Sequence, residues 1–149
     1  MPDTFPAQGA VVLDATNART VAEFYRALLG YDYRAGDEAP PAGQPDPHGD
    51  DWLVLRDRTG AVRLAVQQVD ELPTSTWPAA TIPQQLHLDL TVPNIAELAT
   101  QRDRALSFGA TILQDRSGDP EEPLYVFADP AGHPFCIFVS PEHPDGGAW

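Results

Sequence analysis

The sequence contains an internal repeat, and this repeat limits the possible folds more than any other feature. The tetrad LDAT at residues 13–16 matches LDLT at residues 88–91, an offset of 75 residues, and each ends an apolar run typical of a strand. Further along, WLVLRDRTG at residues 52–60 matches LYVFADPAG at residues 124–132, an offset of 72. Both copies of this second segment read as a strand that ends in an Asp-x-x-Gly turn. The chain is therefore predicted to contain one structural module twice.

A helical pattern follows the first strand of each half. Between residues 21 and 29 the apolar side chains fall at i, i+3, i+4, i+7 and i+8, and Gly30 is typical of a helix end. In the second half, Asn94 and Glu97 resemble a capping box, and Gly109 marks the expected end. The predicted apolar stripe of this second helix consists of Ile95, Leu98, Ala99 and Leu106.

Three strands are expected after each helix. Besides the repeated segment, the strand candidates are residues 31–34 and 61–69 in the first half and residues 110–113 and 133–140 in the second. The polar loop at residues 34–51 is rich in Pro, Gly and Asp, and it is long enough to be mobile or to act as a lid. With a linker at residues 68–85, this order predicts one α+β domain over residues 1–149. Its two βαβββ modules span about residues 9–67 and 86–140.

The charge balance excludes several classes of partner. Nine Arg against 22 Asp and Glu give a formal net charge of -13, which repels nucleic acid phosphates and anionic lipid headgroups. The sequence contains no Lys, which excludes a Schiff-base lysine and a phosphate-loop lysine. We expect no nucleic acid partner and no membrane partner.

Cysteine usage and the start of the chain indicate a compartment. Cys136 is the only cysteine, so no intrachain disulfide can form. The first residues lack a basic start followed by an apolar stretch, and no run approaches the roughly 20 apolar residues that span a bilayer. We therefore expect a soluble protein of the cytoplasm.

Three stretches carry a resemblance to the glyoxalase, bleomycin-resistance and extradiol-dioxygenase superfamily, also called the vicinal oxygen chelate superfamily, and within it to the glyoxalase-like branch. They are VVLDATNARTVAEFYRALLGYD at residues 11–32, LHLDLTV at residues 86–92 and FADPAGHPFCIFVS at residues 127–140. A strand-start histidine, a helix ending in Leu-Gly and a closing Asp-Pro-x-Gly strand recur in that family at this spacing. The resemblance covers nearly the whole chain. It implies a curved mixed sheet around a cavity and a homodimer.

The resemblance also implies where a metal ion would bind. In metal-dependent members, four strand positions, two from each module, converge on one ion, usually as His, Glu or Gln. Here the four positions are occupied by Val12, Leu64, His87 and Cys136. Because two of them cannot ligate and a catalytic ion needs about three protein ligands, we expect no metal and no other cofactor. An alternative stays open in which a glutamine, Gln67 or Gln68, completes a weak site with the two remaining ligands.

The segment QLHLDL places His87 and Asp89 on one side of a predicted strand, opposite the leucines that alternate with them. His87 is either a core histidine, hydrogen-bonded to the backbone or to Asp89, or a group that contacts a ligand or handles a proton. Asp14 holds the equivalent place in the repeat, which favours a structural role over paired acid–base chemistry. Cys136 lies between two apolar residues and is interpreted as an inert buried thiol.

Two tryptophans complete the set of candidate site residues. Trp52 falls in a predicted strand, where aromatic residues are core more often than not. Trp77 lies in the linker between prolines, and no periodic pattern gives it a reason to be buried. The predicted ligand-binding residues are Val12, Asp14, Trp52, Leu64, Trp77, His87, Asp89, Cys136 and Phe138, and no catalytic residue is assigned.

A mostly apolar face with a few polar groups favours the binding of a small organic molecule. The leading hypothesis is therefore a metal-free small-molecule-binding protein that sequesters a cationic or aromatic compound. The alternative is an enzyme of the superfamily, either a metal-dependent lyase or dioxygenase or a metal-independent acid–base enzyme that uses His87. An interaction module with a vestigial pocket also stays open.

Overall fold

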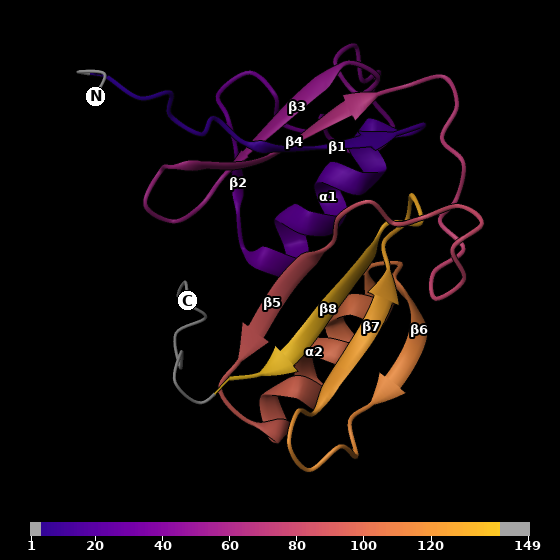
Figure 1. The fold of residues 1–149 in the computed structure, drawn as a ribbon. Helices are drawn as coiled ribbons and strands as arrows, with labels where there is room; N and C mark the ends of the chain where they lie inside the picture. The colour runs from indigo at the N-terminus through magenta and orange to yellow at the C-terminus, as the bar shows by residue number, and fades with distance from the viewer. Residues whose placement is uncertain (1–3, 141–149) are drawn as a thin grey trace. The chain divides into compact units, whose positions relative to one another are not determined.

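The chain forms two compact units, which divide between Glu71 and Leu72. The structure, a computed structural model, describes residues 4–140. Within these residues each unit contains one helix and a four-stranded mixed sheet, in the order strand, helix, three strands (Figure 1). The α+β class and the duplicated βαβββ module are therefore confirmed. No helix in the described part of the chain has the length and apolar character needed to cross a membrane.

The first unit consists of β1 (Val11–Ala15), α1 (Ala18–Leu29), β2 (Asp32–Tyr33), β3 (Trp52–Arg56) and β4 (Val62–Gln68). Its strands lie in the order β1-β4-β3-β2, with β1 parallel to β4 and the other pairs antiparallel. Because α1 packs against β1, β3 and β4, every second side chain of these strands is buried on the α1 side. These side chains include Leu13, Ala15, Leu53, Leu55 and Val66.

The sequence of α1 explains both of its ends. The side chain of Asn17 accepts a hydrogen bond from the Thr20 amide at 3.1 Å and caps the first turn. Gly30 follows the last residue with a φ of 67°, in the left-handed region that glycine adopts readily. Between the two caps, the buried side chains include Val21, Phe24, Tyr25 and Leu28. The apolar periodicity identified this helix correctly.

The loop at residues 34–51 is fastened to the first unit by Arg19 and Asp37. The Arg19 guanidinium donates to the Asp46 carboxylate at 2.7 Å and to the carbonyl oxygen of Asp37 at 2.6 Å. The buried Asp37 carboxylate in turn accepts from the Val54 amide at 2.9 Å. The polar composition indicated a mobile segment or a lid, but these charge-assisted bonds tie the loop to α1 and β3.

The second unit consists of β5 (Leu88–Val92), α2 (Ile95–Ser107), β6 (Thr111–Arg116), β7 (Leu124–Ala128) and β8 (Pro134–Val139). Its strands lie in the order β5-β8-β7-β6, with β5 parallel to β8 and the other pairs antiparallel. α2 covers one face of this sheet (Figure 1). On that face the rings of Phe127 and Phe135 are fully buried and stack with their centroids 5.1 Å apart.

The apolar stripe predicted for α2 is only partly correct. Leu98 is buried, but Ile95 and Leu106 are 60% and 40% exposed. The second buried position is Ala105, which lies seven residues after Leu98 and therefore on nearly the same line along the helix. Since alanine is small, it lets α2 approach the sheet closely. The helix therefore contacts the sheet along a narrower strip than the apolar residues predicted. Asn94 caps the helix as predicted.

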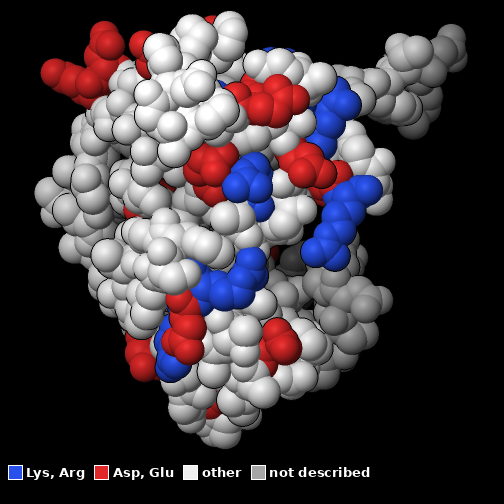
Figure 2. Space-filling model, turned by 180° about the vertical axis from the view of Figure 1, so that it is seen from behind, with Lys and Arg blue, Asp and Glu red and all other residues white. Residues whose placement is uncertain are grey.

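Most arginines are engaged in ion pairs. Six of them contact an Asp or Glu carboxylate, namely Arg19, Arg26, Arg34, Arg63, Arg102 and Arg116. Figure 2 shows acidic and basic side chains next to one another on the face that it draws. Because the chain has nine arginines and 22 acidic residues, the ion pairs leave an excess of negative charge.

Candidate functional site

The face of the second sheet opposite α2 carries an apolar cluster. Its members are Leu124, Val126 and Phe138, which are buried, and Trp77 and Cys136, which pack against them. Cys136 lies beside Val126 in the register of β7 and β8. Trp77 comes from the linker, so part of this segment lies against the sheet. Leu124 and Val126 were not among the predicted site residues, although strand alternation from Phe127 places both on the face opposite α2.

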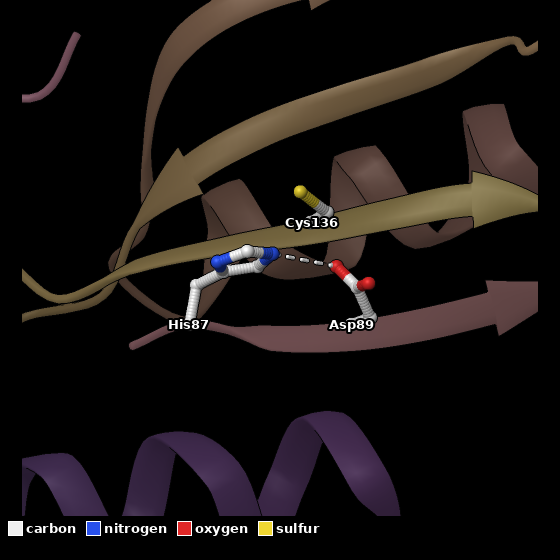
Figure 3. Close-up of side chains that lie close together, drawn as sticks. All are labelled: His87, Asp89 and Cys136. Atoms are coloured by element: carbon white, nitrogen blue, oxygen red, sulfur yellow. Dashed lines mark ion pairs between the residues drawn. The ribbon is translucent and has the colours of Figure 1, made fainter. Parts of the chain in front are cut away.

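A polar pair borders this apolar cluster. Asp89 lies on β5 next to Cys136 in the parallel ladder, and His87 immediately precedes the strand. The His87 Nε2 atom lies 3.2 Å from Asp89 Oδ1 (Figure 3). The two side chains are 41% and 40% exposed, so His87 is not a buried core histidine. It can donate a hydrogen bond to a bound molecule or exchange a proton with it.

Cys136 is the member of the apolar cluster that lies next to Asp89. Burial raises the pKa of Cys136 to about 11, and the negative charge of Asp89 acts in the same direction. Because the thiolate is the nucleophilic form, the protonated thiol is unreactive near neutral pH. This supports the interpretation of Cys136 as an inert thiol.

Alkylation of Cys136 by iodoacetamide in a chelator-containing buffer is therefore expected to be slow. At pH 8 only about 0.1% of a thiol with this pKa is ionised, against about a quarter for an ordinary cysteine, and the greater nucleophilicity of a high-pKa thiolate offsets part of this difference, so the rate should be at least about tenfold below that of glutathione. Asp89→Asn should accelerate the reaction, and denaturant should restore the ordinary rate. Mass spectrometry of timed samples measures it, and a glutathione-like rate in the folded protein would contradict the expectation.

The first sheet presents a row of polar and aromatic side chains on its face opposite α1. Asp14 pairs with Gln67, and Gln67 pairs with Trp52, so the three side chains lie side by side across β1, β4 and β3. Asp14 and Trp52 are exposed. Because neighbouring strands lie about 4.8 Å apart, the backbones that carry the carboxylate and the indole are separated by about 10 Å. This spacing suits a small organic molecule.

Leu64 was predicted to lie on this face, and the strand register places it on the other. Val12 pairs with Ala65, so the preceding Leu64 points to the α1 side, where it is 5% exposed. The cause is a β-bulge between Leu55 and Arg56 that adds one residue to β4. The described pairing of β7 with β8 has no such bulge. The offset of 72 that relates the two halves before the turn is therefore wrong by one residue for β4 and β8. A slip of one residue moves a side chain to the opposite face.

The strand positions that the resemblance associates with a metal ion do not fit a hard divalent ion. With the register corrected, they are Val12, Ala65, His87 and Cys136, because Ala65 lies opposite Val54 as Cys136 lies opposite Val126. Two are hydrocarbon side chains, and a thiol is a poor ligand for ions such as Mg²⁺. Gln67, considered as a replacement ligand, lies beside Asp14 as Cys136 lies beside Asp89, but it offers only a neutral amide oxygen. We therefore derive no catalytic step from a metal ion held by both modules.

The chain is thus an α+β protein built from two βαβββ modules, each with one helix and one mixed sheet. The sequence profile of the glyoxalase-like domain matches residues 10–138, and the chain belongs to this family. No curated protein matches the sequence significantly.

Solved structures share the fold at low sequence identity. A glyoxalase/bleomycin resistance protein/dioxygenase family enzyme from Burkholderia phytofirmans PsJN has a TM-score of 0.61 at 12% identity, over 88% of this chain and 96% of its own. A glyoxalase-related enzyme from Fulvimarina pelagi has a TM-score of 0.62 at 18% identity, over 92% and 90%. The fosfomycin resistance protein FosX from Mesorhizobium loti has a TM-score of 0.62 at 9% identity, over 92% and 94%. At these identities the likeness concerns the fold.

Proposed function

We propose that the chain binds a small organic molecule and does so without a hard divalent metal ion. The observation that carries this proposal is the face of the second sheet where the apolar cluster borders the exposed pair of His87 and Asp89. Apolar side chains exclude water from a bound molecule, and a few polar groups fix its orientation. A site of this composition needs no chemical step to be useful, since tight binding alone sequesters a compound.

The preferred compounds are aromatic and cationic or neutral. The second unit offers the indole of Trp77 and the carboxylate of Asp89 on one face. The first unit offers the same combination in Trp52 and Asp14. An indole stacks on planar groups and attracts cations, and a carboxylate attracts a cation more strongly. The presence of an indole and a carboxylate in each of the two units supports sequestration of a cationic or aromatic compound.

A thermal-shift screen of small aromatic compounds in a chelator-containing buffer tests this function. The best stabilising compound is then titrated by calorimetry against the parent chain and Trp77→Ala. The substitution should weaken binding by about tenfold or more, because a stacking partner is removed. Phe108→Ala is the matched control, since Phe108 is an exposed aromatic residue at the end of α2. Failure of every compound to bind below millimolar concentration, or equal loss in both variants, would contradict the proposal.

A metal-independent acid–base enzyme is the second candidate, and the 3.2 Å contact between His87 and Asp89 favours it. In such an enzyme Asp89 orients the imidazole, and His87 exchanges a proton with the substrate. Incubation of the stabilising compounds with the protein, followed by mass spectrometry, separates the two candidates. Recovery of unchanged compound supports the binding protein. Conversion that is lost in His87→Gln supports the enzyme.

We also propose that the protein is a homodimer in solution. β6 is an edge strand of the second sheet, all of its residues are exposed, and Ile112 and Leu113 are each 40% exposed. An exposed apolar edge strand is a favourable surface for pairing with a second chain. Light scattering at micromolar concentration should give twice the mass of one chain, and Leu113→Lys should shift it toward the monomer. A monomeric mass for the parent protein would contradict this proposal.

A further inference from the structure

Three side chains of different chemistry converge at one point of the second unit. His87, Asp89 and Cys136 each offer one ligand atom, and these atoms lie within 4.8 Å of one another (Figure 3). Asp89 and Cys136 are direct neighbours in the ladder of β5 and β8, and His87 is two residues before Asp89. The strand register therefore sets the spacing of Asp89 and Cys136, and the contact with Asp89 holds His87 beside them. We propose that they form a binding site for a thiophilic divalent metal ion of the Zn²⁺ and Cd²⁺ class.

The distances fit a tetrahedral shell after a small movement. Metal–ligand bonds of 2.0 to 2.3 Å place the ligand atoms of a tetrahedral zinc site about 3.3–3.6 Å apart. The nitrogen of His87 and the oxygen of Asp89 are already 3.2 Å apart. The sulfur needs to approach by at most about 1.5 Å, which half-exposed side chains can accommodate by rotating toward it. The fourth position is left to water or to an external ligand.

The chemistry of the donor set decides which ion is preferred. One imidazole nitrogen, one carboxylate oxygen and one sulfur suit Zn²⁺ and Cd²⁺, whereas Mg²⁺ and Mn²⁺ prefer oxygen ligands. The metal replaces the proton of the Cys136 thiol, which passes to solvent. The net charge of -13 raises the local concentration of any cation, so charge assists binding but does not select the ion. Selectivity therefore rests on the sulfur.

This site differs from a metal site shared between the two modules. Val12 and Ala65 provide no donor atom, so all three ligands belong to the second unit. Three partly exposed ligands hold an ion less tightly than a closed four-ligand site, and a chelator should remove it. The protein is therefore expected to be metal-free after a chelator wash and to take up one ion when Cd²⁺ is supplied. The inference does not rest on the proposed function, because the ion is titrated without any organic compound.

Titration of the reduced, chelator-washed full chain with Cd²⁺ tests the site. We expect one equivalent to bind, with an ultraviolet charge-transfer band from sulfur to metal, and a hundredfold excess of Mn²⁺ should not compete. Cys136→Ser should abolish the band, while His87→Asn and Asp89→Asn should each weaken binding by about tenfold or more. Circular dichroism checks that each variant is folded. If Cys136→Ser does not fold, the other two variants decide.

Matched controls separate this site from general attraction of cations. Asp14→Asn removes an exposed carboxylate at the equivalent strand position of the repeat, and His48→Asn removes an exposed histidine. Both should bind Cd²⁺ like the parent chain and keep the band. Equal weakening in Asp14→Asn and Asp89→Asn would overturn the proposal, because the ion would then follow the net charge. Absence of the band, or effective competition by Mn²⁺, would overturn it as well.

Discussion

Phe127→Ala is expected to destabilise the second unit by about 3–5 kcal/mol. The ring is fully buried between α2 and the sheet, and it stacks on Phe135 with a centroid distance of 5.1 Å. Removing it forfeits the apolar transfer free energy of a large side chain and leaves a cavity beside the remaining ring. Urea unfolding followed by circular dichroism should show a lower midpoint with an unchanged slope.

Phe5→Ala is the control for this substitution, because Phe5 is 68% exposed. It should change the free energy of unfolding by no more than about 0.5 kcal/mol. A double-mutant cycle of Phe127 and Phe135 should give a coupling of about 0.5–1.5 kcal/mol, the usual value for an aromatic pair in contact. A loss below about 1 kcal/mol for Phe127→Ala would show that the ring is not packed as described.

The fold could be predicted from the sequence because the duplicated signals are local. The tetrads LDAT and LDLT, the helix with Gly30 at its end and the two Asp-x-x-Gly turns each depend on a few neighbouring residues. The stripe of α2 was harder, because Ile95 and Leu106 are apolar and yet exposed. Which side of a helix meets a sheet depends on the tertiary packing, and alanine at position 105 gives no hydrophobic signal.

The candidate site shows the limit of reading one repeat from the other. In the second module the neighbouring places of Asp89 and Cys136 follow from alternation within two adjacent strands, and His87 immediately precedes one of them. Leu64 was placed on the wrong face, because a bulge in β4 leaves no recognisable mark in a sequence of alternating apolar residues. Trp77 was singled out as an unexplained residue, but only the three-dimensional structure could supply the cluster that it contacts.

The positions of Asp89 and Asp103 allow the local attraction of a ligand to one carboxylate to be distinguished from its attraction to the net charge of the whole protein. Asp89 borders the apolar cluster, whereas Asp103 is exposed on α2, where its carboxylate pairs with Arg102. Replacing either aspartate with asparagine changes the net charge by the same amount. A ligand attracted only by the overall field would respond equally to both, and salt would screen that field beyond a Debye length of roughly 8 Å. A ligand that contacts the cluster should respond to Asp89 alone.

Cationic aromatic compounds are accordingly expected to bind at least about tenfold more tightly than matched anionic ones, a difference of about 1.4 kcal/mol. Asp89→Asn should remove most of this preference, and Asp103→Asn should leave it unchanged. High salt should reduce the preference only in part, because a contact pair at a half-buried site is screened less than a distant charge. Calorimetry in chelator, with one aromatic scaffold bearing an amine, a neutral group or a carboxylate, measures all three effects. Tightest binding of the carboxylate compound, unaffected by salt or by Asp89→Asn, would instead place the ligand against arginines and contradict the proposed site.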